Sequence, residues 1–177
     1  MRWGLATTGL RRGELLGLRW TDVDLTTRRI HIRQTLMSVG GELSFSTPRT
    51  AKSRRAISLD GATAAALKAH RAAQAAERLA LGLGNASEAL VFTREDGTPV
   101  RPDSLSRHFQ LTAKRLGLPV IRVHDLRHTY ASIALTAGTH PKVVAERLGH
   151  ATVGITLDTY SHVVQSLEEQ AAEAVAT

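Results

Sequence analysis

The apolar positions of the first 60 residues predict one short helix, a turn and a strand. Leucines recur at helical spacing between residues 8 and 20, and Gly17 weakens the end of that helix. Residues 21–29 (TDVDLTTRR) are typical of a turn. In residues 29–36, isoleucines alternate with basic and polar side chains, which predicts a half-buried strand.

A glycine pair at positions 40 and 41 predicts a hairpin turn after this strand. Residues 42–47 (ELSFST) and 54–59 (RRAISL) supply two more strand candidates. Because strands joined by tight turns pair in opposite directions, we expect these segments to form one small antiparallel sheet.

Helical periodicity dominates from residue 59 onward. Residues 59–84 predict an alanine-rich helix that Asp60 caps and a glycine ends. A strand and turn are expected over residues 89–100, and four further helices over residues 102–117, 124–138, 141–149 and 162–176. The fold class is therefore α+β, mainly α, with a small antiparallel sheet.

Composition indicates one globular unit, since 177 residues with 42% hydrophobic side chains can bury a core without cross-links. The chain has no cysteine, which excludes disulfides and thiolate metal sites. No apolar run reaches the roughly 18 residues that cross a bilayer, and the start of the chain lacks the apolar core of a signal peptide. We expect a cytoplasmic protein with no membrane partner.

The net charge of +7 is concentrated toward the N-terminus. Residues 1–60 carry 11 basic and 5 acidic side chains, whereas residues 124–177 carry 3 and 6. Most of the basic residues are arginines, whose planar fork matches phosphate oxygens. This balance favours a nucleic-acid partner, although many solvated protein surfaces are as basic.

Six side chains could act together on a phosphodiester: Arg11, Lys52, His124, Arg127, His150 and Tyr160. No cluster of carboxylates accompanies them, whereas metal-dependent nucleases hold their cations with Asp and Glu, so we expect neither a metal nor another cofactor. Two guanidinium groups could neutralise the phosphate oxygens instead. A tyrosine hydroxyl, with a pKa of about 10, needs a nearby imidazole or cation to lose its proton, and a lysine could protonate the leaving oxygen.

Each of these residues also has an ordinary structural explanation. A tyrosine in a helix is usually a packing residue, and a basic residue in a charged run is usually solvated. His150 follows a glycine and could cap a helix end, while His124 and Arg127 could pair with Asp125 at the surface. Spacing alone does not choose between these explanations and a shared site.

Four segments in a fixed order resemble the tyrosine recombinase or phage integrase family: TGLRRGELLGLRWTDVDL, HDLRHTYASIALTAG, ERLGH and TLDTYSHV. The resemblance spans about residues 5 to 165, and its long motifs make it specific. It implies a mainly helical catalytic domain of the DNA breaking-rejoining type. It also implies a site-specific DNA recombinase that forms a 3′-phosphotyrosyl intermediate without ATP or metal.

The resemblance assigns roles to the candidate residues. Tyr160 matches the nucleophile, and its proton transfer would be assisted by His124. The phosphate would be clamped by Arg11 and Arg127 and hydrogen-bonded by His150. Glu14 is expected to brace Arg11. Four further arginines are expected to contact double-stranded DNA: Arg12, Arg49, Arg54 and Arg55.

The general acid is the position at which this chain departs from the family pattern. Relatives commonly read Pro-Lys-Thr in the hairpin, whereas this chain reads Pro48-Arg49-Thr50. Lys52 is the only lysine there and is the better proton donor, because a guanidinium stays charged.

Residues 1–177 are expected to form the catalytic domain alone, because Met1 falls just before the first motif and leaves no room for an N-terminal core-binding domain. The predicted C-terminal helix carries an apolar stripe, and the resemblance implies that such a segment docks on a neighbouring protomer, so we expect self-association on DNA. Packing of the stripe within the same chain is the alternative. The resemblance also implies a bacterial or phage-encoded, nucleoid-associated protein. Two alternatives stay open: a non-catalytic or truncated DNA-binding remnant of an integrase, and a type IB topoisomerase-like DNA relaxing enzyme.

Overall fold

A computed structural model describes residues 8–47, 54–84, 89–161 and 163. Its helices are α2 (Arg12–Leu16), α3 (Gly61–Ala80), α4 (Pro102–Arg115), α5 (Val123–Thr136), α6 (Pro141–Leu148) and α7 (Val153–Thr159), with a 3₁₀ turn η1 (Trp20–Asp22). Five short strands accompany them: β1 (Val23–Asp24), β2 (Arg29–His31), β3 (Thr35–Val39), β4 (Glu42–Ser46) and β5 (Ala56–Ser58). The predicted α+β, mainly helical class is confirmed.

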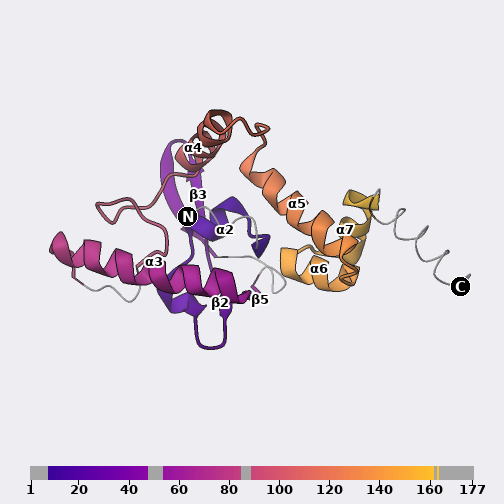
Figure 1. Cartoon of the computed structure of the whole chain (residues 1–177), viewed down its shortest axis with the longest axis horizontal. Helices are drawn as coiled ribbons and strands as arrows, with labels where there is room; N and C mark the ends of the chain where they lie inside the picture. The colour runs from indigo at the N-terminus through magenta and orange to yellow at the C-terminus, as the bar shows by residue number, and fades with distance from the viewer. Residues whose placement is uncertain (1–7, 48–53, 85–88, 162, 164–177) are drawn as a thin grey trace, which may run out of the picture.

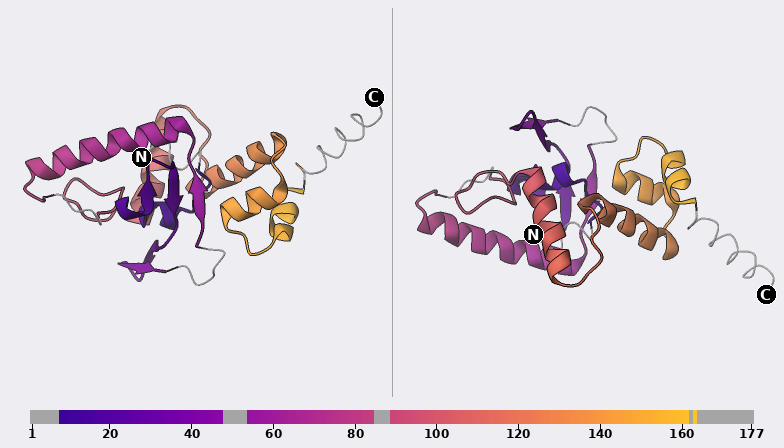
Figure 2. Two further views of the ribbon diagram at one scale, coloured as in Figure 1. Left: turned by 90° about the horizontal axis from the view of Figure 1, so that it is seen from below. Right: turned by 90° about the horizontal axis from the view of Figure 1, so that it is seen from above.

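The strands form two antiparallel sheets, so the prediction of one sheet is wrong. One sheet has the order β1-β2-β5, and the other is the β3-β4 hairpin. Figure 2 shows α3 along one side of the three-stranded sheet and the hairpin projecting on the opposite side. The strand predicted over residues 29–36 is therefore divided between the two sheets.

Close packing against α2 explains this division. The Gln34 side chain donates a hydrogen bond to the Gly17 carbonyl at 2.8 Å, where the chain leaves the first sheet. Gly13 then faces β3 so closely that a Cβ on it would lie 2.6 Å from the Leu36 carbonyl oxygen. Small residues on α2 thus let the β3 backbone approach the helix, and alternation of side chains does not reveal such a contact.

Most helix predictions are confirmed. The helix predicted from residue 59 is α3, whose N-cap Asp60 accepts a hydrogen bond from the Thr63 amide at 2.8 Å. The helix predicted over residues 8–20 is much shorter, because Arg11 is extended at the N-cap of α2. α7 was not predicted, and residues 89–100 contribute only isolated bridges rather than a strand. The predicted helix over 162–176 lies outside the described residues, Val163 excepted.

Two apolar clusters divide the molecule. The larger joins the three-stranded sheet, α2, α3 and α4 around side chains such as Leu16, Ile30 and Val91. The smaller holds Leu135 of α5, Leu148 of α6 and the ring of Tyr160. In Figure 1, α5, α6 and α7 accordingly gather at one end of the molecule, away from α3. None of the helices described is both long and apolar enough to cross a bilayer.

Candidate active site

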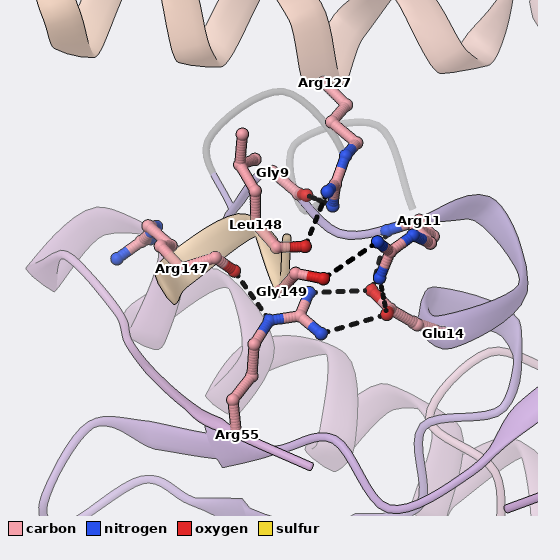
Figure 3. Close-up of polar contacts among 8 residues, drawn as sticks. All are labelled: Gly9, Arg11, Glu14, Arg55, Arg127, Arg147, Leu148 and Gly149. Atoms are coloured by element: carbon pink, nitrogen blue, oxygen red, sulfur yellow. Dashed lines mark hydrogen bonds and ion pairs between the residues drawn. The ribbon is translucent and has the colours of Figure 1, made fainter. Parts of the chain in front are cut away.

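A buried carboxylate organises the N-terminal part of the candidate site. Glu14 of α2 is 3% exposed and accepts hydrogen bonds from the Arg11 amide at 2.9 Å and the Arg11 guanidinium at 2.8 Å. Arg55, just before β5, donates to both Glu14 oxygens at 3.0 and 2.9 Å (Figure 3). The predicted contact between Glu14 and Arg11 is therefore present, and Arg55 joins it.

The two arginines keep Glu14 ionised. Burial by itself would raise the pKa of the Glu14 carboxyl. The hydrogen bonds and positive charges of Arg55 and Arg11 outweigh burial and lower that pKa below its ordinary value. One negative charge thus lies between two guanidinium groups, and the cluster keeps a net positive charge.

Arg127 brings the second cation from α5. Its side chain is buried and donates to the Gly9 carbonyl at 2.7 Å and to the Leu148 carbonyl. Burial and the charge of Arg11 lower its pKa to about 10, so it remains charged at neutral pH. Figure 3 shows Arg127 reaching down from the helix above and Arg11 reaching in from the right, toward Leu148 and Gly149.

That turn depends on Gly149. Its φ of 67° lies in the left-handed region, and a Cβ on it would stand 2.8 Å from an Arg55 Nη1 atom. The Gly149 carbonyl accepts a hydrogen bond from Arg11 at 3.1 Å, and the neighbouring Arg147 carbonyl accepts one from Arg55. The end of α6 is thus attached to the N-terminal cluster, which places His150 beside it.

His150 is a neutral imidazole at physiological pH. Partial burial and the charges of Arg127 and Arg11 lower its pKa to about 4. Its Nδ1 lies 2.8 Å from the hydroxyl of Thr156, a fully buried residue of α7. Because α7 was not predicted, this orienting contact was missed from the sequence.

Tyr160 follows α7 and is 2% exposed. Its ring packs in the smaller apolar cluster, and its hydroxyl lies 2.9 Å from Nδ1 of His128. Burial raises the pKa of Tyr160, and the nearby charge of Arg127 opposes that rise. The buried ring agrees with a packing role for Tyr160. Its hydroxyl also interacts electrostatically with Arg127.

His124 and His128 occupy successive turns of α5, with ring centroids 4.9 Å apart in an edge-on contact. Burial, His128 and Arg127 lower the pKa of His124. Asp125 is bound instead to Arg122 at 2.9 Å, so the structure contradicts a simple surface pair of Asp125 with Arg127. His128 belongs to the HDLRHTY motif, but the motif alone assigned it no role.

The arginines expected at the DNA surface differ in their surroundings. Arg54 is exposed. Arg12 donates to the Ser106 hydroxyl of α4 at 2.7 Å, and the Arg55 side chain is only 7% exposed against Glu14. Arg49 and Lys52 lie outside the described residues.

Metal ligands do not gather in the described part of the chain: no three His, Asp or Glu side chains there are grouped to hold an ion. In that part of the chain, the polar groups of the site are guanidinium and imidazole side chains near the Glu14 carboxylate.

Comparisons with known proteins identify relatives of this chain. The chain is 33% identical to a tyrosine recombinase XerC-like protein of Caldanaerobacter subterraneus over 94% of its length and 46% of the relative. It is 31% identical to the ICEBs1 integrase of Bacillus subtilis, over 94% of this chain and 45% of that integrase. The chain thus spans about half the length of these curated relatives.

Solved structures share the fold. The integrase of transposon Tn1549, in complex with transposon right-end DNA, superposes with a TM-score of 0.77 at 24% identity, covering 95% of this chain and 56% of that one. A crystal structure of XerA recombinase gives a TM-score of 0.70 at 22% identity, over 94% and 54% of the two chains. Residues 4–166 match the sequence profile of the phage integrase family. The chain therefore belongs to the phage integrase family, whose members include tyrosine recombinases.

Proposed function

We propose that this chain cleaves and rejoins double-stranded DNA through a covalent link between Tyr160 and a 3′-phosphate. One observation carries the proposal: Arg11 and Arg127, 116 positions apart, converge on the turn before His150, and Tyr160 lies within electrostatic reach of Arg127. Convergence of two cations and a hydroxyl is the arrangement that attack on a phosphodiester needs.

The proposed reaction exchanges one ester for another. The Tyr160 oxygen attacks phosphorus, a P–O5′ bond breaks, and a free 5′-hydroxyl leaves. Arg11 and Arg127 bind the non-bridging oxygens, where negative charge increases in the transition state. Attack by a 5′-hydroxyl of another strand reverses the step, so the bond energy is conserved throughout.

His150 is suited to a hydrogen bond with the phosphate. As a neutral imidazole held through Nδ1 by Thr156, it can present Nε2–H as a donor. The negative charge of the phosphate would then counteract the positive charges of Arg127 and Arg11, which lower the His150 pKa. His124 is proposed to assist transfer of the Tyr160 proton.

The remaining roles complete the proposal. Lys52 protonates the leaving 5′-oxygen, or Arg49 occupies that position. Arg54, exposed beside the site, contacts the DNA backbone with Arg49 and Arg12. Arg55 is proposed to hold Glu14 and the end of α6 in place, because its guanidinium is bound to Glu14 and to the Arg147 carbonyl.

Strand exchange requires more than one active site, so we further propose that copies of the protein assemble on DNA through the segment after Tyr160. The structure of the Tn1549 integrase contains DNA, which supports a DNA partner for this chain. A location at the bacterial nucleoid is proposed on the strength of that partner. Among the described residues of the site, no contact favours the remnant or the DNA-relaxing alternative.

A nicked suicide duplex tests the function. The nick lies in the cleaved strand, a few nucleotides to the 3′ side of the scissile phosphate. Cleavage then frees a short oligonucleotide with a 5′-hydroxyl, and its loss traps the protein–DNA ester. The wild-type chain should form this adduct, and Tyr160→Phe should bind the duplex with similar affinity but form none. Adducts with Tyr160→Phe would overturn the assignment. Relaxed plasmid without recombinant products would instead support the topoisomerase-like alternative.

A further inference from the structure

The hydrogen bond between Tyr160 and His128 is the contact on which a further role depends. Among the described residues, His128 Nδ1 is the partner of the Tyr160 hydroxyl, at 2.9 Å. A phenol needs a proton acceptor at such a distance when it attacks phosphorus. The other imidazole facing this part of the site, His150, is engaged by Thr156 through its own Nδ1.

The placement of His128 suits a proton acceptor. With its proton on Nε2, the imidazole offers the Nδ1 lone pair to the hydroxyl. The rings of His128 and Tyr160 lie 5.8 Å apart at 54°, and His128 is half-buried at the edge of a hollow that also exposes Asp125 and Thr129. An imidazolium formed there would face the Asp125 carboxylate, which already interacts electrostatically with His128.

His124 lies one helical turn before His128 on α5. Its ring meets His128 edge-on at 4.9 Å, so on the face of α5 His128 lies between His124 and Tyr160. Proton transfer to His124 would accordingly pass through His128.

We infer that His128 is a catalytic residue, the base that accepts the Tyr160 proton during cleavage and returns it during rejoining. When the Tyr160 oxygen bonds to phosphorus and the 5′-oxygen leaves, the hydroxyl proton moves to His128 Nδ1. In the reverse step the 5′-hydroxyl attacks and gives its proton back to the group that protonated the leaving 5′-oxygen, the tyrosyl–phosphorus bond breaks, and His128 returns the other proton to the Tyr160 oxygen. This inference rests on the proposed function and replaces direct proton transfer to His124.

Asparagine separates proton acceptance from positioning. The Oδ1 of an asparagine lies near the place of the histidine Nδ1 and accepts a hydrogen bond, but it does not take up a proton. In single-turnover cleavage of the suicide duplex at saturating protein, we expect His128→Asn to react roughly 100-fold slower. Its affinity for DNA should stay within twofold of wild type, as should both properties of His108→Asn, a change at an exposed histidine of α4.

Chemical rescue distinguishes a proton acceptor from a residue with a purely structural role. Added imidazole should accelerate cleavage by His128→Ala at least tenfold, without effect on wild type or Tyr160→Phe. Cleavage by His128→Asn within threefold of wild type, or failure of imidazole to accelerate a folded His128→Ala, would overturn the inference. Absence of any adduct with the wild-type chain would instead contradict the proposed function itself.

Discussion

Glu14 and Arg55 form a bidentate ion pair in the interior, with the two guanidinium nitrogens 3.0 and 2.9 Å from the two carboxylate oxygens. The same carboxylate binds Arg11, and the same guanidinium binds the Arg147 carbonyl at 2.6 Å. Through this pair, α2 and β5 are attached to the end of α6. The position of α2 and β5 relative to the end of α6 therefore depends on the buried negative charge of Glu14.

Replacing Glu14 with glutamine should destabilise the fold and slow cleavage together. The change leaves Arg55 buried without its counterion, a situation that costs about 3 kcal/mol of unfolding free energy in buried pairs. Urea denaturation measures that cost. The matched control is Asp103→Asn, because Asp103 pairs with Arg12 at 3.5 Å with its side chain 79% exposed, and its loss should leave stability almost unchanged. Equal stability of both variants would contradict the organising role of Glu14.

The two arginines should respond differently to lysine. The Arg11 side chain is 40% exposed, so Arg11→Lys should cost less than about 1 kcal/mol of stability. Buried Arg127 supports two carbonyl groups, and its replacement should cost about 2 kcal/mol. Both changes replace a guanidinium, which can donate two hydrogen bonds to the phosphate at once, with an ammonium group. Each should slow single-turnover cleavage by roughly 100-fold or more. Wild-type cleavage by either folded variant would show that its guanidinium does not bind the phosphate.

Stability should fall as the solution is acidified through the range set by His150. Its pKa is about 4 in the folded protein and about 6.5 in an unfolded chain, so the unfolded state binds the extra proton between these values. After allowance for partial exposure, the loss of unfolding free energy between pH 7 and pH 5 should be about 1 kcal/mol from this residue. His150→Gln should show a correspondingly smaller change in denaturation midpoint over the same pH range. An identical pH dependence in both proteins would be inconsistent with a depressed His150 pKa.

Much of the fold could be predicted because its signals are local. The cap at Asp60, the glycine pair before Glu42 and the proline that opens α4 are each recognisable over a few residues. The contact of Glu14 with Arg11 was also predictable, since the two residues are three positions apart at a helix start.

The rest depends on contacts between distant segments. Nothing near Arg55 in the sequence indicates a buried pair with Glu14, 41 positions away. The hydrogen bond between His128 and Tyr160 likewise depends on how the Tyr160 ring packs in the apolar cluster with Ala131 and Leu135 of α5. Arg55 was expected to contact DNA, but local sequence does not distinguish an exposed arginine from a buried one.

Identification of the modified residue tests the central claim most directly. The protein is trapped on a suicide duplex, digested with trypsin and nuclease, and the peptide that carries a nucleotide is sequenced by mass spectrometry. We expect the nucleotide on Tyr160, attached through its 3′-phosphate, with a free 5′-hydroxyl on the other DNA end. A nucleotide on another residue, or a 5′-phosphate linkage, would contradict the account.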